Sequence, residues 1–147
     1  MSADDPLSSE VIKLFALITD RYTREYDSAA AHHGLTAQQV KVLLILDEAP
    51  LPMRRMAERL GAEPSNLTGV VDRLQARGLV ERQADPNDRR VKLLVTTDDG
   101  AVMAKDLRER LRFARNPLAD LDADQRHALR DLLRLMAGSD ERGPKSV

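Results

Sequence analysis

Two groups of polar residues near the middle of the chain combine side chains and spacing that could do chemistry. The segment from Asp85 to Arg90 (DPNDRR) has the composition of a tight turn and carries two adjacent arginines. The segment that begins at Pro64 (PSNLTG) brings together small polar side chains, whose hydroxyl and amide groups can hydrogen-bond to base edges. Both groups are therefore candidates for contact with a nucleic acid. The candidate residues are Pro64, Ser65, Asn66, Thr68, Gly69, Arg73, Arg77, Asp88, Arg89 and Arg90.

The elements that would position these residues are two short helices and a hairpin. Apolar residues recur at helical spacing up to Leu60, and Gly61 follows where a left-handed residue would end the helix. Pro64 suits the first position of a second helix, because it has no N–H to leave unpaired and its φ is already helical. Two helices joined by about three residues form a helix-turn-helix, in which the second helix reads DNA. Two β-prone runs then follow, Leu79 to Ala84 and Val91 to Thr96, and predict a hairpin.

The hairpin tip is predicted to place arginine in the minor groove of DNA. An exposed arginine on a narrow projection suits this narrow and strongly negative groove. Asp88 is predicted to hold a neighbouring arginine in one rotamer through a charge-assisted hydrogen bond. In an isolated hairpin, Arg89 and Arg90 would be better interpreted as a solvated turn. Directly after a helix-turn-helix, the DNA-binding interpretation is favoured, and which arginine enters the groove stays open.

Charge is distributed unevenly along the 147 residues, whose net charge is -1. Residues 1–50 hold 4 Lys/Arg and 8 Asp/Glu, whereas residues 51–97 hold 9 Lys/Arg and 6 Asp/Glu, a net charge of +3. Such a local excess matters within a Debye length of about 10 Å, although by itself it fits ordinary surface charge equally well. The chain has no cysteine and no apolar run near the ~20 residues of a membrane span, so a cytoplasmic protein is expected.

The segments on either side of this unit are predicted to be helical. A long amphipathic helix from Ser8 to about Ala31 has more apolar surface than its own core needs, which suggests a partner helix from a second copy. A plain core helix is the alternative. Capping patterns at Thr36, Thr97 and Asp122 begin three further helices. The charged residues of the helix after Thr97, including Arg108, are interpreted as a solvated surface.

No residue pattern indicates catalysis, a cofactor or a metal. The adjacent residues His32 and His33 could suggest metal binding, but sequence neighbours are expected to point in different directions, and no cysteine or third histidine lies at ligand spacing. There is no nucleophile–base arrangement and no phosphate-binding loop, which argues against an enzyme. A winged-helix module for protein–protein contact is the remaining rival, but it would not need two arginines at its tip.

The central unit resembles the MarR family of bacterial and archaeal transcription regulators. The resemblance rests on the segments PSNLT from Pro64, VDRL from Val71, RGLVER from Arg77, DPNDRR from Asp85 and TDDG from Thr97, in that order and with the family's spacing. It implies a homodimer with intertwined terminal helices that binds a palindromic operator and mostly represses. It also implies that a small aromatic or phenolic ligand between the dimer helices and the DNA-binding lobe lowers DNA affinity.

The resemblance also has limits at particular residues. Pro52 lies where family members often have a Ser or Thr cap, which leaves the start of the following helix open. The peroxide-sensing members use a cysteine in the first helix, and that mode is excluded here. Arg21, Tyr22, Tyr26 and His33 lie in the region where the ligand would bind, but surface or core roles suit each of them better.

The expected fold is mainly α with a small β-hairpin. Residues 36–100 would form a winged helix-turn-helix DNA-binding domain, and residues 8–35 and 101–138 would form dimerisation helices. Residues 1–7 and 139–147 would be flexible tails. The expected partners are double-stranded DNA, a second copy of the chain and the aromatic ligand.

Overall fold

The computed structural model of the protein describes residues 5–138, which separate into two compact units. The first unit ends at Arg115 and contains five helices and a three-stranded sheet among its described residues. The second unit begins at Asn116 and contains helix α6 (Ala123–Ala137). In the described part of the chain, no helix is both long and apolar enough to cross a membrane.

Helix α1 (Pro6–His32) begins slightly earlier than the sequence predicts. The side chain of Asp5 accepts hydrogen bonds from the N–H groups of Leu7 and Ser8, and Pro6 occupies the first turn. In the predicted N-terminal tail, residue 5 therefore caps the helix and residues 6 and 7 are helical. The rest of the predicted tails, residues 1–4 and 139–147, lies outside the described residues.

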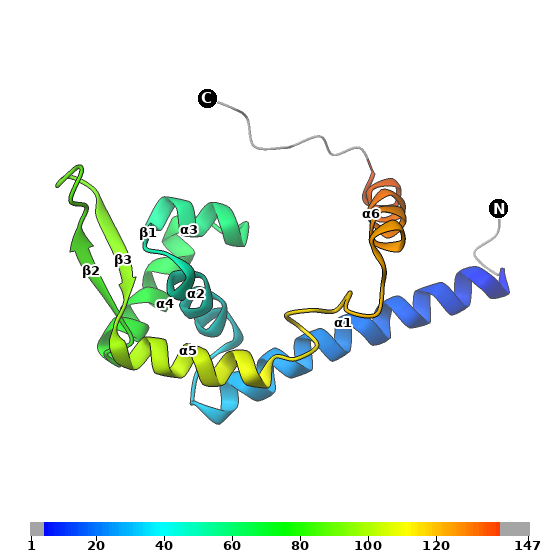
Figure 1. The fold of residues 1–147 in the computed structure, drawn as a ribbon, viewed down its shortest axis with the longest axis horizontal. Helices are drawn as coiled ribbons and strands as arrows, with labels where there is room; N and C mark the ends of the chain where they lie inside the picture. Colours follow the sequence, from blue (N-terminus) through cyan, green and yellow to red (C-terminus); the bar gives the residue numbers. More distant parts are fainter. Residues whose placement is uncertain (1–4, 139–147) are drawn as a thin grey trace. The chain divides into compact units, whose positions relative to one another are not determined.

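The two halves of α1 have different surroundings. Near its C-terminal end, Ala29 and Ala30 are buried against the core, and Tyr22 and Tyr26 pack beside them. The N-terminal half extends away from the other elements of the first unit (Figure 1). Its large apolar side chains are exposed, namely Leu7, Val11, Ile12, Leu14, Phe15, Leu17 and Ile18.

Helix α2 (Ala37–Glu48) is the centre of the core. Thr36 and Gln39 form the predicted capping box: each side chain bonds to the backbone N–H of the other residue. The chain then forms α3 (Met53–Leu60) and α4 (Pro64–Ala76), the predicted helix-turn-helix. Gly61 ends α3 at φ 61°, in the left-handed region, as the sequence indicated.

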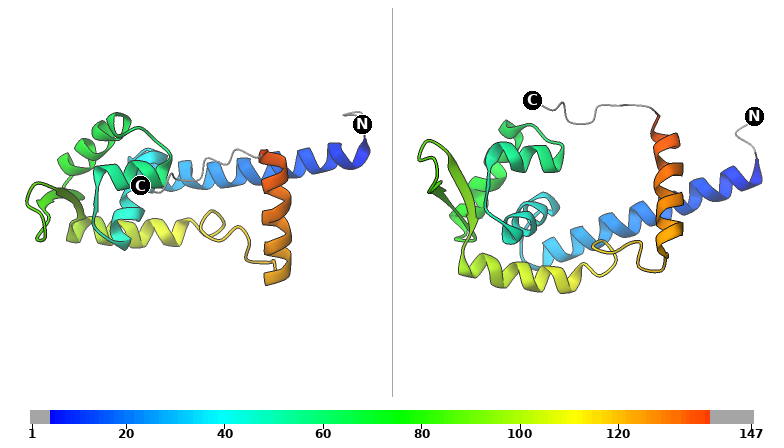
Figure 2. Two further views of the ribbon diagram at one scale, coloured as in Figure 1. Left: turned by 90° about the horizontal axis from the view of Figure 1, so that it is seen from above. Right: turned by 45° about the horizontal axis from the view of Figure 1, so that its top comes forward.

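The sheet has one strand more than the predicted hairpin. Strands β2 (Val80–Ala84) and β3 (Lys92–Thr96) pair antiparallel, and the short strand β1 (Leu51–Pro52) pairs with the other edge of β3. Pro52 is tolerated because β1 is an edge strand, where a missing N–H leaves no ladder bond broken. Pro52 is also the N-cap residue of α3, which begins at Met53 without a side-chain cap hydrogen bond. The β2–β3 hairpin stands out from the helices as a narrow wing (Figure 1 and Figure 2).

Helix α5 (Asp98–Arg110) is joined tightly to the base of the wing. Thr97 caps it, and the same residue bonds back to the start of the wing: its hydroxyl donates to the carbonyl of Gly78 at 2.6 Å, and its N–H donates to the carbonyl of Leu79 at 3.1 Å. Gly100 lies against this joint. A Cβ at Gly100 would meet the Leu79 carbonyl oxygen at 2.1 Å, so only glycine allows this approach.

Helix α5 ends before the break predicted at Asn116 and Pro117. Regular helix stops at Arg110, and the carboxylate of Glu25 in α1 accepts the N–H groups of Phe113 and Ala114. A side chain from α1 therefore takes the place of the helical carbonyls for these two donors. Arg108, which was interpreted as part of a solvated surface, instead forms a partly buried ion pair with Asp47 of α2.

Helix α6 begins at the predicted Asp122–Gln125 capping box and ends at Gly138. None of its residues is buried, and Leu132, Leu133, Leu135 and Met136 are exposed. Like the first half of α1, α6 presents exposed apolar side chains.

Candidate nucleic-acid interface

The outward face of α4 has the predicted polar composition and is open to solvent. Leu67, Val71 and Leu74 are fully buried on its inner face and fix the orientation of the helix. The candidates on the other face are all exposed, namely Pro64, Ser65, Asn66, Thr68, Gly69 and Arg73. Thr68 donates its hydroxyl proton to the carbonyl of Pro64 at 3.2 Å, which leaves the oxygen lone pairs free to accept a hydrogen bond.

Gly69 lies in the middle of this exposed face without a structural reason. A Cβ at this position would meet no atom within 4 Å. Glycine in a helix interior costs about 1 kcal/mol relative to alanine. The fold therefore does not require glycine here, and the backbone of α4 is open to close approach at this position.

The wing tip presents its two arginines to solvent. Arg89 and Arg90 are both exposed, and the side chain of Arg90 is 96% exposed. Asp88 organises the tip through the backbone: its carboxylate accepts the N–H of Arg90 at 3.1 Å, whereas its distance to the Arg90 Nε atom is 3.9 Å, too long for a hydrogen bond. The predicted rotamer-fixing hydrogen bond is therefore not formed, and Asp88 instead fixes the conformation of the turn.

A side-chain contact that the sequence analysis missed links α4 to the wing. Arg82 of β2 donates to the carboxylate of Asp72 at 2.7 Å and also bonds to the amide oxygen of Gln75. Asp72 and Gln75 are three residues apart on one face of α4, and this spacing is a signal for a shared partner. The contact fixes the base of the wing against the reading helix.

Arg77 differs from the other candidates because its guanidinium is engaged within the chain. Its Nη1 atom donates to the carbonyls of His33 at 2.8 Å and Gly34 at 3.2 Å, just after α1. Arg77 thus joins the end of α4 to the turn between α1 and α2. A direct DNA contact by Arg77 stays a prediction, and its bonds indicate a positioning role.

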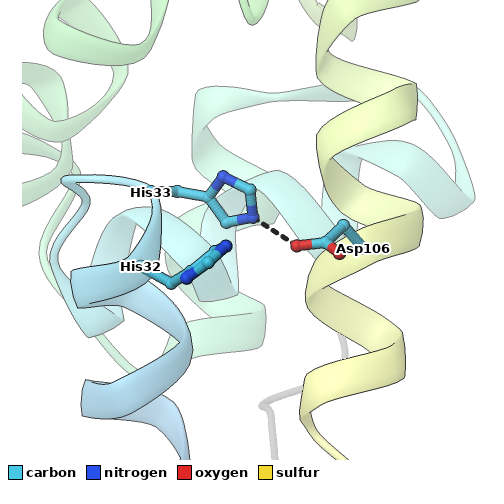
Figure 3. A group of neighbouring side chains, drawn as sticks. All are labelled: His32, His33 and Asp106. Atoms are coloured by element: carbon cyan, nitrogen blue, oxygen red, sulfur yellow. Dashed lines mark hydrogen bonds and ion pairs between the residues drawn. The ribbon is translucent and has the colours of Figure 1, made fainter.

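A second polar cluster lies where the end of α1 meets α5 (Figure 3). His33 Nε2 lies 2.5 Å from Asp106 Oδ2, and Arg110 donates to Asp106 at 2.8 Å and to His32 Nε2 at 2.7 Å. The hydrogen bonds from Arg110 and then from His33 hold the pKa of Asp106 below its ordinary value. The expectation that the two histidines point in different directions is not met, because their ring centroids lie 5.0 Å apart.

The region expected for a ligand contains an open hollow of about 670 Å³ between α1 and the end of α5. Arg21 lies on its wall with its guanidinium 4.1 Å from the ring centre of Phe113. Tyr22 and Tyr26 instead pack on each other and on Lys41, away from the lining. The lining residues that carry charge are Asp20, Arg21, Arg24, Glu25, Glu109, Arg110 and Arg112.

The exposed reading helix and the arginine-tipped wing define a winged helix-turn-helix of the DNA-binding class. Comparison with known sequences identifies the family. A profile of the MarR family matches residues 33–91. The HTH-type transcriptional regulator TtmR of Methylorubrum extorquens strain PA1 is 34% identical to this chain over 94% of the chain and 75% of TtmR. The chain belongs to the MarR family, and it is a DNA-binding transcriptional regulator and not an enzyme.

Other relatives and solved structures agree with this assignment. The HTH-type transcriptional repressor NicR of Pseudomonas putida is 29% identical over 92% of this chain and 87% of NicR. The crystal structure of CouR from Rhodococcus jostii RHA1 bound to p-coumaroyl-CoA has a TM-score of 0.74 at 28% identity, and covers 98% of this chain and 99% of CouR. A mutant of MarR from E. coli complexed with operator DNA has a TM-score of 0.66 at 26% identity, over 91% of this chain and 100% of that one.

These comparisons confirm the predicted family and the predicted fold class, with the sheet enlarged by β1. The residues predicted to contact DNA are exposed, and their roles stay predictions. The division of the chain into dimerisation and DNA-binding segments also stays a prediction.

Proposed function

We propose that the protein binds a palindromic operator as a homodimer and represses transcription from the genes it controls. In this proposal, α4 of each copy lies in the major groove and the wing tip reaches the adjacent minor groove. The observation that carries the proposal is the open, polar face of α4, with a glycine at its centre that the fold does not require. Because its proposed partner is operator DNA, the protein would act in the cytoplasm.

Contacts with DNA divide by their chemistry. Ser65, Asn66 and Thr68 offer hydrogen-bonding groups near the start of α4, which suits base edges. Pro64 and Gly69 allow close approach, and Arg73 suits a phosphate. On the wing, Arg89 and Arg90 would enter the minor groove, with Asp88 setting the turn that presents them.

Dimerisation would cover the apolar surfaces that the single chain leaves exposed. Seven large apolar side chains on the first half of α1 and four on α6 are exposed, and full burial of a large apolar side chain contributes about 1.5–3 kcal/mol. Residues 8–35 and 101–138 would therefore pair with the same segments of a second copy. The two-fold symmetry of such a dimer would explain a palindromic operator.

Selection of bound duplexes from a random pool tests the proposal directly. We expect a two-fold symmetric consensus whose half-sites lie about one helical turn apart, and a sedimentation coefficient of a dimer at micromolar concentration. Retention of unrelated duplexes with no consensus would contradict sequence-specific binding. If the consensus were an unrepeated half-site, or the protein sedimented as a monomer, the homodimer would be wrong while DNA recognition would stand.

The sign of regulation and the inducer form the second part of the proposal. Repression is supported by the likeness to NicR, which is named a repressor. A small aromatic or phenolic ligand, bound in the hollow between α1 and the end of α5, would lower DNA affinity. The arginines of that hollow suit an anionic aromatic acid, and the structure of CouR holds the aromatic thioester p-coumaroyl-CoA.

This part is tested with the selected operator in hand. Titration with p-coumarate and with p-coumaroyl-CoA should release the duplex, and Arg112→Ala, which removes one lining arginine, should weaken release more than it weakens DNA binding. Release by neither compound would reject both as inducers. A reporter gene placed behind the operator should be expressed more strongly when the protein is absent, and the opposite result would make it an activator.

A further inference from the structure

The cluster at the end of α1 has the composition of a metal site. One ring nitrogen each from His32 and His33 and one carboxylate oxygen of Asp106 lie within 4.8 Å of one another. The ligands come from two elements that are far apart in sequence but packed together in the fold (Figure 3). We propose that His32, His33 and Asp106 bind a divalent transition-metal ion, with Zn²⁺ as the ion their chemistry suits best.

The local backbone explains why two adjacent histidines converge. Successive residues in a helix point about 100° apart, since a turn holds 3.6 residues. His32 is the last residue of α1, whereas His33 has left the helix, with φ -106° and ψ 6°. This change of backbone direction brings the two rings together in a T-shaped arrangement, with interplanar angle 89°.

The spacing of the ligand atoms can be adjusted to a metal by side-chain rotation. In a tetrahedral zinc site with bonds of about 2.0–2.1 Å, ligand atoms lie roughly 3.3 Å apart. His33 Nε2 and Asp106 Oδ2, at 2.5 Å, would move apart after the proton that His33 Nε2 donates is released to solvent or moves to Nδ1. The most widely separated ligand atoms, which lie within 4.8 Å of each other, would move closer together. His32 is exposed, so its ring has room to rotate once the bond from Arg110 is released, whereas the side chain of His33 is only 20% exposed and provides the fixed point.

The ligand set selects the kind of ion. Two imidazole nitrogens and one carboxylate suit Zn²⁺, Ni²⁺, Co²⁺ and Fe²⁺, whereas Mg²⁺ and Ca²⁺ prefer oxygen ligands only. The chain has no cysteine, so no thiolate competes for the ion. Three protein ligands leave a fourth position for water, as in open zinc sites.

Without a metal ion, the guanidinium of Arg110 supplies the positive charge that contacts Asp106 and His32 in this cluster. Its guanidinium donates at once to Asp106 and to His32 Nε2. Because arginine has no acceptor, His32 Nε2 must accept this bond, and so it carries the lone pair that a metal needs. A bound ion would displace Arg110, whose side chain is 39% exposed and can move into solvent.

A metal at this position would fasten α1 to α5. His33 is also the residue whose carbonyl accepts Arg77 from the end of α4. The ion would therefore hold together the turn after α1, the helix that follows the wing, and the contact from the reading helix. Metal binding depends only on the first unit of this chain, so its test is independent of the operator.

The test measures binding of ZnCl₂ to the full-length protein by calorimetry, with MgCl₂ as the matched control ion. We expect one Zn²⁺ per chain and no binding of Mg²⁺. The visible absorption of added CoCl₂ should show nitrogen and oxygen ligands in a four-coordinate site. His33→Ala and Asp106→Asn should each lower Zn²⁺ affinity at least about tenfold.

Two further variants separate a built site from adventitious binding to surface histidines. His127→Ala removes the third histidine of the chain, on α6, and should leave Zn²⁺ affinity unchanged. Arg110→Ala removes the competing cation and should raise Zn²⁺ affinity. Zn²⁺ should also raise the melting temperature of the wild type but not of Asp106→Asn. Loss of affinity in His127→Ala equal to that in His33→Ala, or no Zn²⁺ binding by the wild type, would overturn the proposal.

Discussion

Two surfaces of the winged unit are built in opposite ways, and a glycine in each shows the difference. At the joint between wing and α5, a Cβ on Gly100 would clash with the Leu79 carbonyl oxygen at 2.1 Å. On the outward face of α4, a Cβ on Gly69 would meet nothing within 4 Å. The first glycine is required by the fold, whereas the second is not. One surface is fixed by internal packing, whereas the other is open, as the proposed contact with DNA requires.

The largest effect is expected at the wing tip, on the free surface. Arg89→Ala combined with Arg90→Ala should weaken operator binding at least about thirtyfold, because each arginine contact contributes roughly 1–3 kcal/mol. Unfolding by urea should be unchanged, since neither side chain packs on the fold. Fluorescence anisotropy with the selected duplex measures the affinity.

The matched control for the wing variant is Lys105→Ala, which removes a positive charge from an exposed position on α5. It should change affinity only slightly. Wild-type affinity in the double arginine variant would show that the wing does not enter the minor groove, and would leave the tip as a solvated turn.

The next largest effect is expected at the packed joint. Gly100→Ala should lower the free energy of unfolding by about 2–3 kcal/mol, near the upper end for overpacking, because the obstacle is backbone and cannot rotate away. Chemical denaturation followed by circular dichroism measures the change. A stability equal to that of the wild type would mean that α5 can shift away from Leu79 without cost, and the contrast between the two glycines would fail.

A smaller effect, with opposite signs in two measurements, is expected for Gly69→Ala. Replacing glycine by alanine in an exposed helix interior should stabilise the fold by about 0.5–1 kcal/mol. The same methyl group should weaken operator binding by keeping α4 away from DNA. If affinity were unchanged while stability rose, Gly69 would have no role in close approach to DNA.

The smallest effect concerns the partly buried phenol group of Tyr26. Partial burial first, and the neighbouring Tyr22 second, raise the pKa of Tyr26 to about 12 from its ordinary value of 10.0. Since the folded-state pKa is the higher one, the related stability is fully present below pH 10 and is lost as pH rises towards 12. Ultraviolet titration should show a late phenolate transition that Tyr26→Phe removes. A single transition near pH 10 would contradict this prediction.

Much of the fold could be predicted because the residues that begin and end its helices act on backbone groups close to them in the sequence. The capping residues Thr36, Thr97 and Asp122 bond to backbone groups within three residues, and Gly61 and Pro64 act through their own backbone geometry. Sequence patterns report such short-range effects well. The strand β1 was missed because two residues that include a proline carry no strand pattern of their own.

The contacts that sequence could not reveal join distant residues. Glu25 accepts hydrogen bonds from the backbone just after α5 although it lies 88 residues earlier in the chain, and His33 contacts Asp106 across 73 residues. Arg77 was predicted to contact DNA from its place at the end of the reading helix, whereas its bonds to the turn after α1 join residues that are far apart in the sequence. The exposure of the candidates on α4 followed from helical periodicity, since the same pattern that identifies the buried face of this helix identifies the opposite face.

The double attachment of Thr97 to the start of the wing has a mechanical consequence. Thr97 follows the last strand of the hairpin and bonds to the carbonyls of Gly78 and Leu79, just before the first strand, so both strands are held together beside the first turn of α5. The tip lies at the opposite end of the hairpin. Strands of five residues act as an arm of about 17 Å, so a tilt of about 10° at the pivot would swing the arginines by roughly 3 Å. A displacement of that size is about the length of a hydrogen bond, so a tilt at this joint would be enough to form or break a contact made by the tip.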